Sequence, residues 1–119
     1  MNTSFLLPLL LIACSSTLQA QTTNLTEQQR RDISAVIDQY SLAREKSDTV
    51  LLKKILTKDI DHLVSNGEWR SGIRQAVEGM VASSAATPGT RKLTIHNIRL
   101  LTSNAATVVC RYEIANDDG

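Results

Sequence analysis

Apolar residues between Thr26 and Lys46 recur at intervals of three and four, which is typical of one buried face of an α-helix. The residues of this stripe are Ile33, Val36, Ile37, Tyr40 and Ala43 or Arg44. Thr26 and Gln29 are spaced as in a capping box, in which each side chain satisfies the backbone N–H of the other residue. We therefore expect a helix that begins after Thr26 and runs to about Lys46.

A second, shorter helix is predicted directly downstream. Ser47-Asp48 supplies a side-chain oxygen for the N-cap position. The apolar residues that follow at helical spacing are Leu51, Leu52, Ile55 and Leu56. We expect this helix to end near Thr57.

From Asp59 the apolar period changes to two, which predicts a β-strand. One side of this strand carries Ile60, His62 and Val64. Asn66-Gly67 follows, a pair that favours a type I′ hairpin turn because both residues tolerate a positive φ. Glu68, Trp69 and Arg70 are then expected to form the return strand.

A third amphipathic helix follows the hairpin. Its apolar face consists of Ile73, Ala76, Val77, Met80, Val81 and Ser84. Thr87-Pro88-Gly89 predicts the end of this helix, because proline and glycine disfavour its continuation.

Two long strands are predicted after the third helix. The apolar positions of the first change from odd numbers at Leu93 and Ile95 to even numbers at Ile98 and Leu100, so we expect a bulge near His96-Asn97. A turn at Ser103-Asn104 leads into the second strand. One face of that strand carries Ala106, Val108, Cys110, Tyr112 and Ile114.

The composition and the net charge argue against some classes of binding partner. A chain of 119 residues has room for one domain, and a net charge of +1 with scattered Lys and Arg argues against nucleic acid. No run of about 18 apolar residues occurs, so we expect no transmembrane helix. Because aromatic residues make up only 3% of the chain, the core must be aliphatic.

Residues 1–20 resemble a secretory signal peptide. The apolar segment Ser4–Cys14 is followed by small residues that allow cleavage after Ala20, although Lys and Arg are absent from the first residues. We therefore expect export to the periplasm or the medium, with residues 21–119 as the mature domain. Leu11–Cys14 also resembles the lipobox of bacterial lipoproteins, and lipid anchoring at Cys14 stays open as an alternative.

After cleavage at Ala20, Cys110 would be the sole cysteine, so no intrachain disulfide is expected. His62 and His96 lie far apart, and no Cys or His pair has the spacing of metal ligands. We expect neither a metal site nor another cofactor, and Cys110 is interpreted as a small core residue.

Three stretches together resemble the nuclear transport factor 2-like superfamily, in particular its SnoaL-like and SgcJ/EcaC-type branch, which is mostly of unknown function. They are "IDQYSLAREKSDTVLLKKILTKDID", "NGEWRSG" and "RYEI". The resemblance covers Gln28–Gly119 and implies an α+β cone, with three N-terminal helices packed on a curved, mainly antiparallel sheet around a pocket. Relatives often pair through the sheet, so it also implies a homodimer for the full-length protein.

The resemblance also implies two further strands, so we expect the chain to be truncated at its C-terminus. In the ketosteroid isomerase relatives a helix Tyr polarises a substrate oxygen and a strand carboxylate moves the proton. Tyr40 matches that Tyr by its spacing to Asp48, whereas the position of the base falls on Val64, which cannot accept a proton. That route is therefore disfavoured.

We expect the pocket to bind a small, largely apolar molecule. The residues expected to line it are Tyr40, His62, Trp69 and Tyr112. Arg70 is expected to pair with Glu68 or with a carboxylate of the third helix, or to receive an anionic ligand. Two alternatives stay open: a lyase, isomerase or cyclase with Tyr40 and His62 as acid-base groups, or a homodimerising interaction module.

Overall fold

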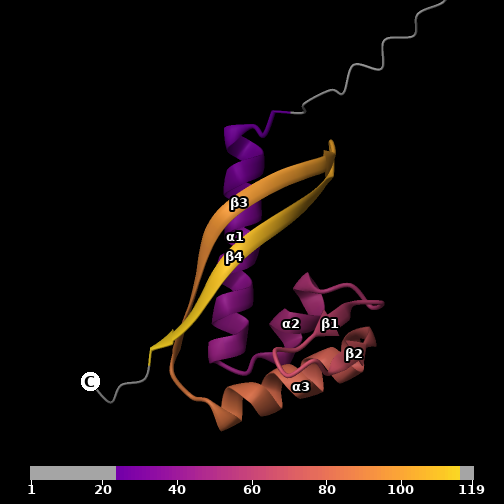
Figure 1. Ribbon diagram of the computed structural model, residues 1–119, viewed down its shortest axis with the longest axis vertical. Helices are drawn as coiled ribbons and strands as arrows, with labels where there is room; N and C mark the ends of the chain where they lie inside the picture. Colours follow the sequence, from indigo (N-terminus) through magenta and orange to yellow (C-terminus); the bar gives the residue numbers. More distant parts are fainter. Residues whose placement is uncertain (1–23, 116–119) are drawn as a thin grey trace, which may run out of the picture.

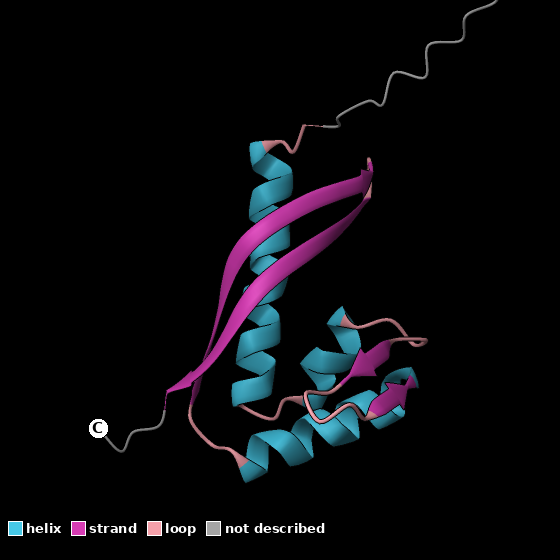
Figure 2. Ribbon diagram, viewed as in Figure 1, coloured by secondary structure: helices cyan, strands magenta, loops and turns pink. Residues whose placement is uncertain are grey.

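The computed structural model describes residues 24–115, so the predicted signal peptide and Cys14 lie outside the described part of the chain. The described elements are α1 (Glu27–Glu45), α2 (Thr49–Ile55), β1 (Asp61–Leu63), β2 (Trp69–Ser71), α3 (Gly72–Ala86), β3 (Thr90–Thr102) and β4 (Ala105–Ala115). The strands form two antiparallel hairpins, β1–β2 and β3–β4, each a two-stranded sheet (Figures 1 and 2). Every element predicted from the hydrophobic pattern is present.

The start of α1 confirms the predicted capping box. The backbone N–H of Gln29 donates to Thr26 Oγ1 at 3.1 Å, and the backbone N–H of Thr26 donates to Gln29 Oε1 at 2.9 Å. At the other end Ser47 adopts the left-handed conformation with φ 51°, which reverses the chain. Asp48 then caps α2 as predicted, because its carboxylate accepts the N–H of Leu51 at 2.9 Å.

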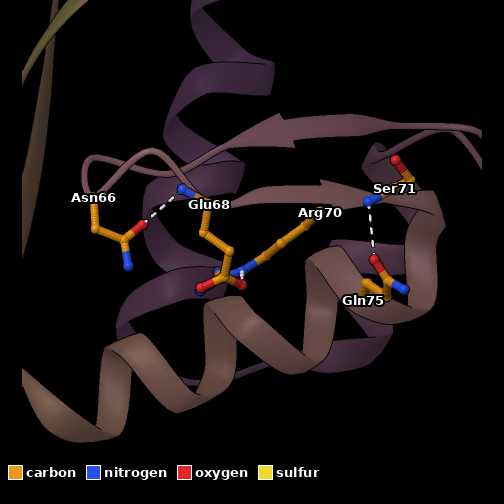
Figure 3. Close-up of polar contacts among 5 residues, drawn as sticks. All are labelled: Asn66, Glu68, Arg70, Ser71 and Gln75. Atoms are coloured by element: carbon orange, nitrogen blue, oxygen red, sulfur yellow. Dashed lines mark hydrogen bonds and ion pairs between the residues drawn. The ribbon is translucent and has the colours of Figure 1, made fainter.

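The turn of the β1–β2 hairpin differs from the predicted type I′ turn. Gly67 donates its N–H to the Val64 carbonyl at 2.8 Å, and Val64 donates to the Glu68 carbonyl at 2.9 Å, so the loop contains three residues. Only Gly67 has a positive φ, 86°, while Asn66 does not. Asn66 Oδ1 accepts the N–H of Glu68 at 2.9 Å, and this bond favours the longer loop with a left-handed glycine (Figure 3).

The junction between β2 and α3 is fixed by backbone and side-chain hydrogen bonds. Gly72 has φ 80°, and its N–H donates to the Ile60 carbonyl at 2.7 Å, which ties α3 to the segment before β1. Gln75 Oε1 accepts the N–H of Ser71 at 3.0 Å (Figure 3). The short hairpin is therefore held in a defined position against the start of α3.

The β3–β4 hairpin is long and bends along α1 (Figure 1). Its register shifts between Ile95 and Asn97, which confirms the predicted bulge, and shifts again between Leu100 and Thr102. Gln29 Nε2 donates to the Ser103 carbonyl at 3.3 Å and joins the start of α1 to the tip of this hairpin.

The fully buried apolar core is small and lies where the C-terminal half of α1 meets α2 and α3. It consists of Ala43, Leu52, Ala76, Val77 and Met80. Val36 was expected on the buried stripe of α1 but is 49% exposed, because α2 and α3 pack only at the far end of that helix (Figure 1). At this end the stripe instead buries the charged Arg44.

Candidate functional site

A cavity of about 440 Å³ lies between α1, α3 and the two hairpins. Its lining comes from α1 (Tyr40, Arg44), from the C-terminal end of α3 and the residue after it (Ser83, Thr87), from the short hairpin (His62, Leu63, Val64, Ser65, Arg70) and from the long hairpin (Leu93, Tyr112, Ile114). Segments distant in the sequence thus meet around one hollow. Its volume lies within the range of roughly 300–1,000 Å³ that is common for small-molecule sites.

Arg44 is the most deeply buried charged residue of this lining, with 7% of its surface exposed. Its Nε donates to Ser84 Oγ at 3.3 Å and its Nη1 donates to the Tyr40 hydroxyl oxygen at 2.9 Å. Within residues 24–115 the ion pairs do not include Arg44. Because arginine stays protonated in proteins, this site holds a buried positive charge with neutral partners.

Arg70 enters the cavity from β2 and is paired with a carboxylate. Its Nε lies 2.8 Å from Glu68 Oε1, which is one of the partners predicted for it (Figure 3). The hydrogen bond from Arg70, followed by its positive charge, lowers the pKa of Glu68. The guanidinium lies so close to Gly79 on α3 that a Cβ at this position would overlap it.

His62 lies on β1 opposite Arg70, its register partner on β2. Burial is the first cause that lowers the pKa of His62 below 6.5, and the positive charges of Arg70 and Arg44 lower it further. His62 is therefore mainly neutral at pH 7. Its Nδ1 is enclosed by the protein and makes no hydrogen bond to the described residues.

The long hairpin supplies the apolar part of the lining. Leu93 on β3 is the register partner of Tyr112 on β4, and Ile114 lies two residues further along the same face. The predicted parity of β4 placed Tyr112 and Ile114 together, and both line the cavity. The site therefore combines two arginines and a neutral histidine with an aliphatic and aromatic wall.

Three of the four residues expected to line the pocket are brought together here: Tyr40, His62 and Tyr112. Trp69 is not among the lining residues and is 57% exposed, so its expected place in the pocket is wrong. Successive strand residues point to opposite faces, and because Arg70 faces the cavity, Trp69 faces away from it.

Reasoning from the sequence did not identify Arg44 as a charged residue of the cavity. Its position four residues after Tyr40, on the same helix face, was the available signal. Among the described residues Cys110 is a free, half-buried thiol, and it is not part of the cavity lining. The ion pair between Arg111 and Glu113, 3.2 Å on the exposed face of β4, also lies outside it.

Metal ligands do not gather in the described part of the chain, where no three His, Cys, Asp or Glu residues form a group that could hold an ion. Within residues 24–115, none of the helices combines the length and the apolar character needed to cross a membrane.

The comparisons with known proteins show the fold. No protein-family model matches the chain, and no curated protein matches it. Among solved structures the chain is similar to an NTF-2-like protein of unknown function from Shewanella oneidensis MR-1, with 24% identity over 76% of this chain and 77% of that one, and a TM-score of 0.57. The chain therefore has the nuclear transport factor 2-like fold, an α+β architecture.

Proposed function

We propose that this protein is an exported, SnoaL-like domain that binds a small organic molecule with a largely apolar body in the cavity beside Tyr40. The observation that carries the proposal is a hollow of ligand size in which an apolar wall faces polar side chains, among them Arg44 and the Tyr40 hydroxyl, whose O–H is left to donate. Leu93, Tyr112 and Ile114 offer contact area to the apolar body of such a molecule. The SnoaL-like assignment rests on the sequence resemblance.

Two-dimensional NMR of the isotope-labelled full chain tests the proposal. The probes are a panel of aromatic, steroid-like and polyketide-like compounds, and we expect some of them to shift the resonances of Tyr112, Ile114 and His62. Shifts spread over the whole surface, or no shifts with any compound, would refute a ligand site in this cavity.

A matched pair of variants on β4 sharpens this test. Ile114→Trp fills the cavity and should abolish the shifts. Val109→Trp introduces the same side chain on the opposite face of the strand, at a residue that is 61% exposed, and should leave binding unchanged. Equal effects of the two substitutions would show that the probes bind elsewhere.

An acid-base enzyme is a second candidate, because Tyr40 and His62 line the same cavity. The Tyr40 hydroxyl oxygen already accepts a hydrogen bond from Arg44, so its own O–H proton is left to donate to a substrate oxygen. Neutral His62 can accept a proton. Val64 also lines the cavity and has no proton acceptor, so we do not propose the carboxylate-based isomerase route.

The test of this candidate is the pH dependence of turnover of any compound that binds. A reaction that depends on neutral His62 should lose rate as the pH falls through the pKa of this residue, and His62→Gln should abolish turnover while the compound still binds. Turnover that survives in His62→Gln would exclude this role of His62.

A further inference from the structure

We propose that the molecule bound in this cavity is an organic acid and that Arg44 binds its carboxylate. The inference rests on the proposed function and specifies its ligand class. It depends on three features of the described residues: the charge balance of the lining, the unused donors of Arg44, and the apolar wall opposite them.

The charge balance of the cavity lining is positive. Arg44 and Arg70 both contribute a guanidinium, whereas the lining residues within 24–115 include no Asp or Glu. Glu68 neutralises Arg70 at 2.8 Å from outside the lining, so one buried positive charge, that of Arg44, stays uncompensated among residues 24–115. A buried charge is costly unless it is paired, and an anionic ligand would pair it.

The hydrogen bonds of Arg44 leave donors for that ligand. Arg44 Nε donates to Ser84 and Arg44 Nη1 donates to Tyr40. Within residues 24–115, Arg44 Nη2 donates to no partner. The Tyr40 O–H is also left to donate, because its oxygen accepts from Arg44. Two donors at this end of the cavity, one of them charged, match the acceptor oxygens of a carboxylate.

A singly charged group fits the site better than a phosphate. Among residues 24–115, Arg70 has a carboxylate partner and Arg44 has none, and burial together with both arginines lowers the pKa of His62, so that it adds no third positive charge at neutral pH. Leu93, Tyr112 and Ile114 then receive the apolar part of the molecule. The expected class is therefore an aryl or alkyl carboxylic acid.

The proposal is tested by comparing acids with their isosteric amides on the unmodified full chain. 4-Phenylbutyrate and 4-phenylbutyramide form one pair, phenylacetate and phenylacetamide another, and affinity is measured by calorimetry and by NMR shifts of the Arg44 side chain. We expect each acid to bind roughly tenfold to a hundredfold more tightly than its amide, because a charged hydrogen bond is lost in the amide. Phenyl phosphate should bind more weakly than either acid.

Variants identify the residue responsible. Arg44→Gln should remove the preference for the acid, and Tyr40→Phe should reduce it, which provides a second measurement if Arg44→Gln does not fold. Arg74→Gln is the matched control, because Arg74 carries the same charge on α3, lies outside the cavity lining and is exposed. We expect this control to keep the full preference.

The outcomes separate this inference from the proposed function. Amides that bind in the cavity as tightly as the acids, or a tighter phenyl phosphate, would overturn the carboxylate inference and leave a small-molecule site standing. An acid preference that Arg74→Gln reduces as much as Arg44→Gln would overturn the role of Arg44. If none of the probes shifts a cavity resonance, both proposals fail.

Discussion

Arg44 Nη1 lies 2.9 Å from the hydroxyl oxygen of Tyr40, one helical turn earlier on α1. The same pair is stacked loosely, with the guanidinium carbon 5.8 Å from the centroid of the ring. The helix spacing of four residues produces this contact, while the burial of Arg44 depends on α3, which carries its second partner Ser84. Both side chains are thereby held at the wall of the cavity.

The buried charge of Arg44 predicts a cost in stability. An unpaired buried charge is costly, so Arg44→Met, which removes it at similar side-chain length, should raise the free energy of unfolding by about 1 kcal/mol. Urea denaturation measures this change. Arg74→Met, at an exposed residue, should stay within about 0.5 kcal/mol of the unmodified protein. A loss of stability larger than about 2 kcal/mol in Arg44→Met would indicate that the charge is structural.

Gly79→Ala is expected to displace Arg70 without unfolding α3. The added Cβ overlaps the guanidinium of Arg70, which is the flexible end of a side chain, while alanine favours the helix by about 1 kcal/mol. Because the charge of Arg70 lowers the pKa of His62, moving it away should raise that pKa. An NMR titration of the His62 ring measures the change, and an unaltered pKa would contradict the contact.

The pKa of His62 predicts how stability depends on pH. The folded state holds this pKa below 6.5, so between 6.5 and the folded value the unfolded chain binds a proton that the folded chain does not. Stability should therefore be highest above pH 6.5 and fall as the pH drops toward the folded pKa. Urea midpoints at pH 7.5 and 5.5 measure this loss, and His62→Gln should make it smaller.

The fluorescence of Trp69 is expected to respond to quenchers in the solvent and not to a ligand in the cavity. It is 57% exposed and lies on the face of β2 opposite Arg70, so acrylamide should quench its fluorescence efficiently. Addition of a cavity ligand should leave the emission unchanged, and Trp69→Phe should bind the same probes with the same affinity. A ligand-dependent shift of the emission maximum would place the site beside Trp69 instead.

Export predicts a defined mature mass. Cleavage after Ala20 should leave a chain that begins at Gln21, whereas lipidation at Cys14 should leave a longer chain that carries a diacylglycerol group. Intact-mass measurement of protein recovered from the expressing cells and from the medium distinguishes the two. The mass of the unprocessed chain would contradict both.

The sequence alone determined those features that depend on neighbouring residues. The capping box at Thr26, the N-cap at Asp48 and the bulge after Ile95 follow from local hydrogen bonds and from hydrophobic period. The same period placed His62 of β1 and Val64, which directly follows β1, on one side of the chain, and Tyr112 on the face of β4 that meets the cavity. Such patterns are visible because a helix and a strand repeat over a few residues.

The tertiary structure alone decided which side chains share the cavity. Arg44 becomes a buried charge because α3 packs against the end of α1, where Arg44 donates to Ser84, a residue 40 positions further along the chain. Trp69 was misplaced because the parity of β2 is fixed by its pairing with β1, through a three-residue loop that the Asn-Gly pair did not reveal. The local sequence determines which residues share one face of a helix or strand. Long-range packing determines which other elements, or which cavity, that face contacts.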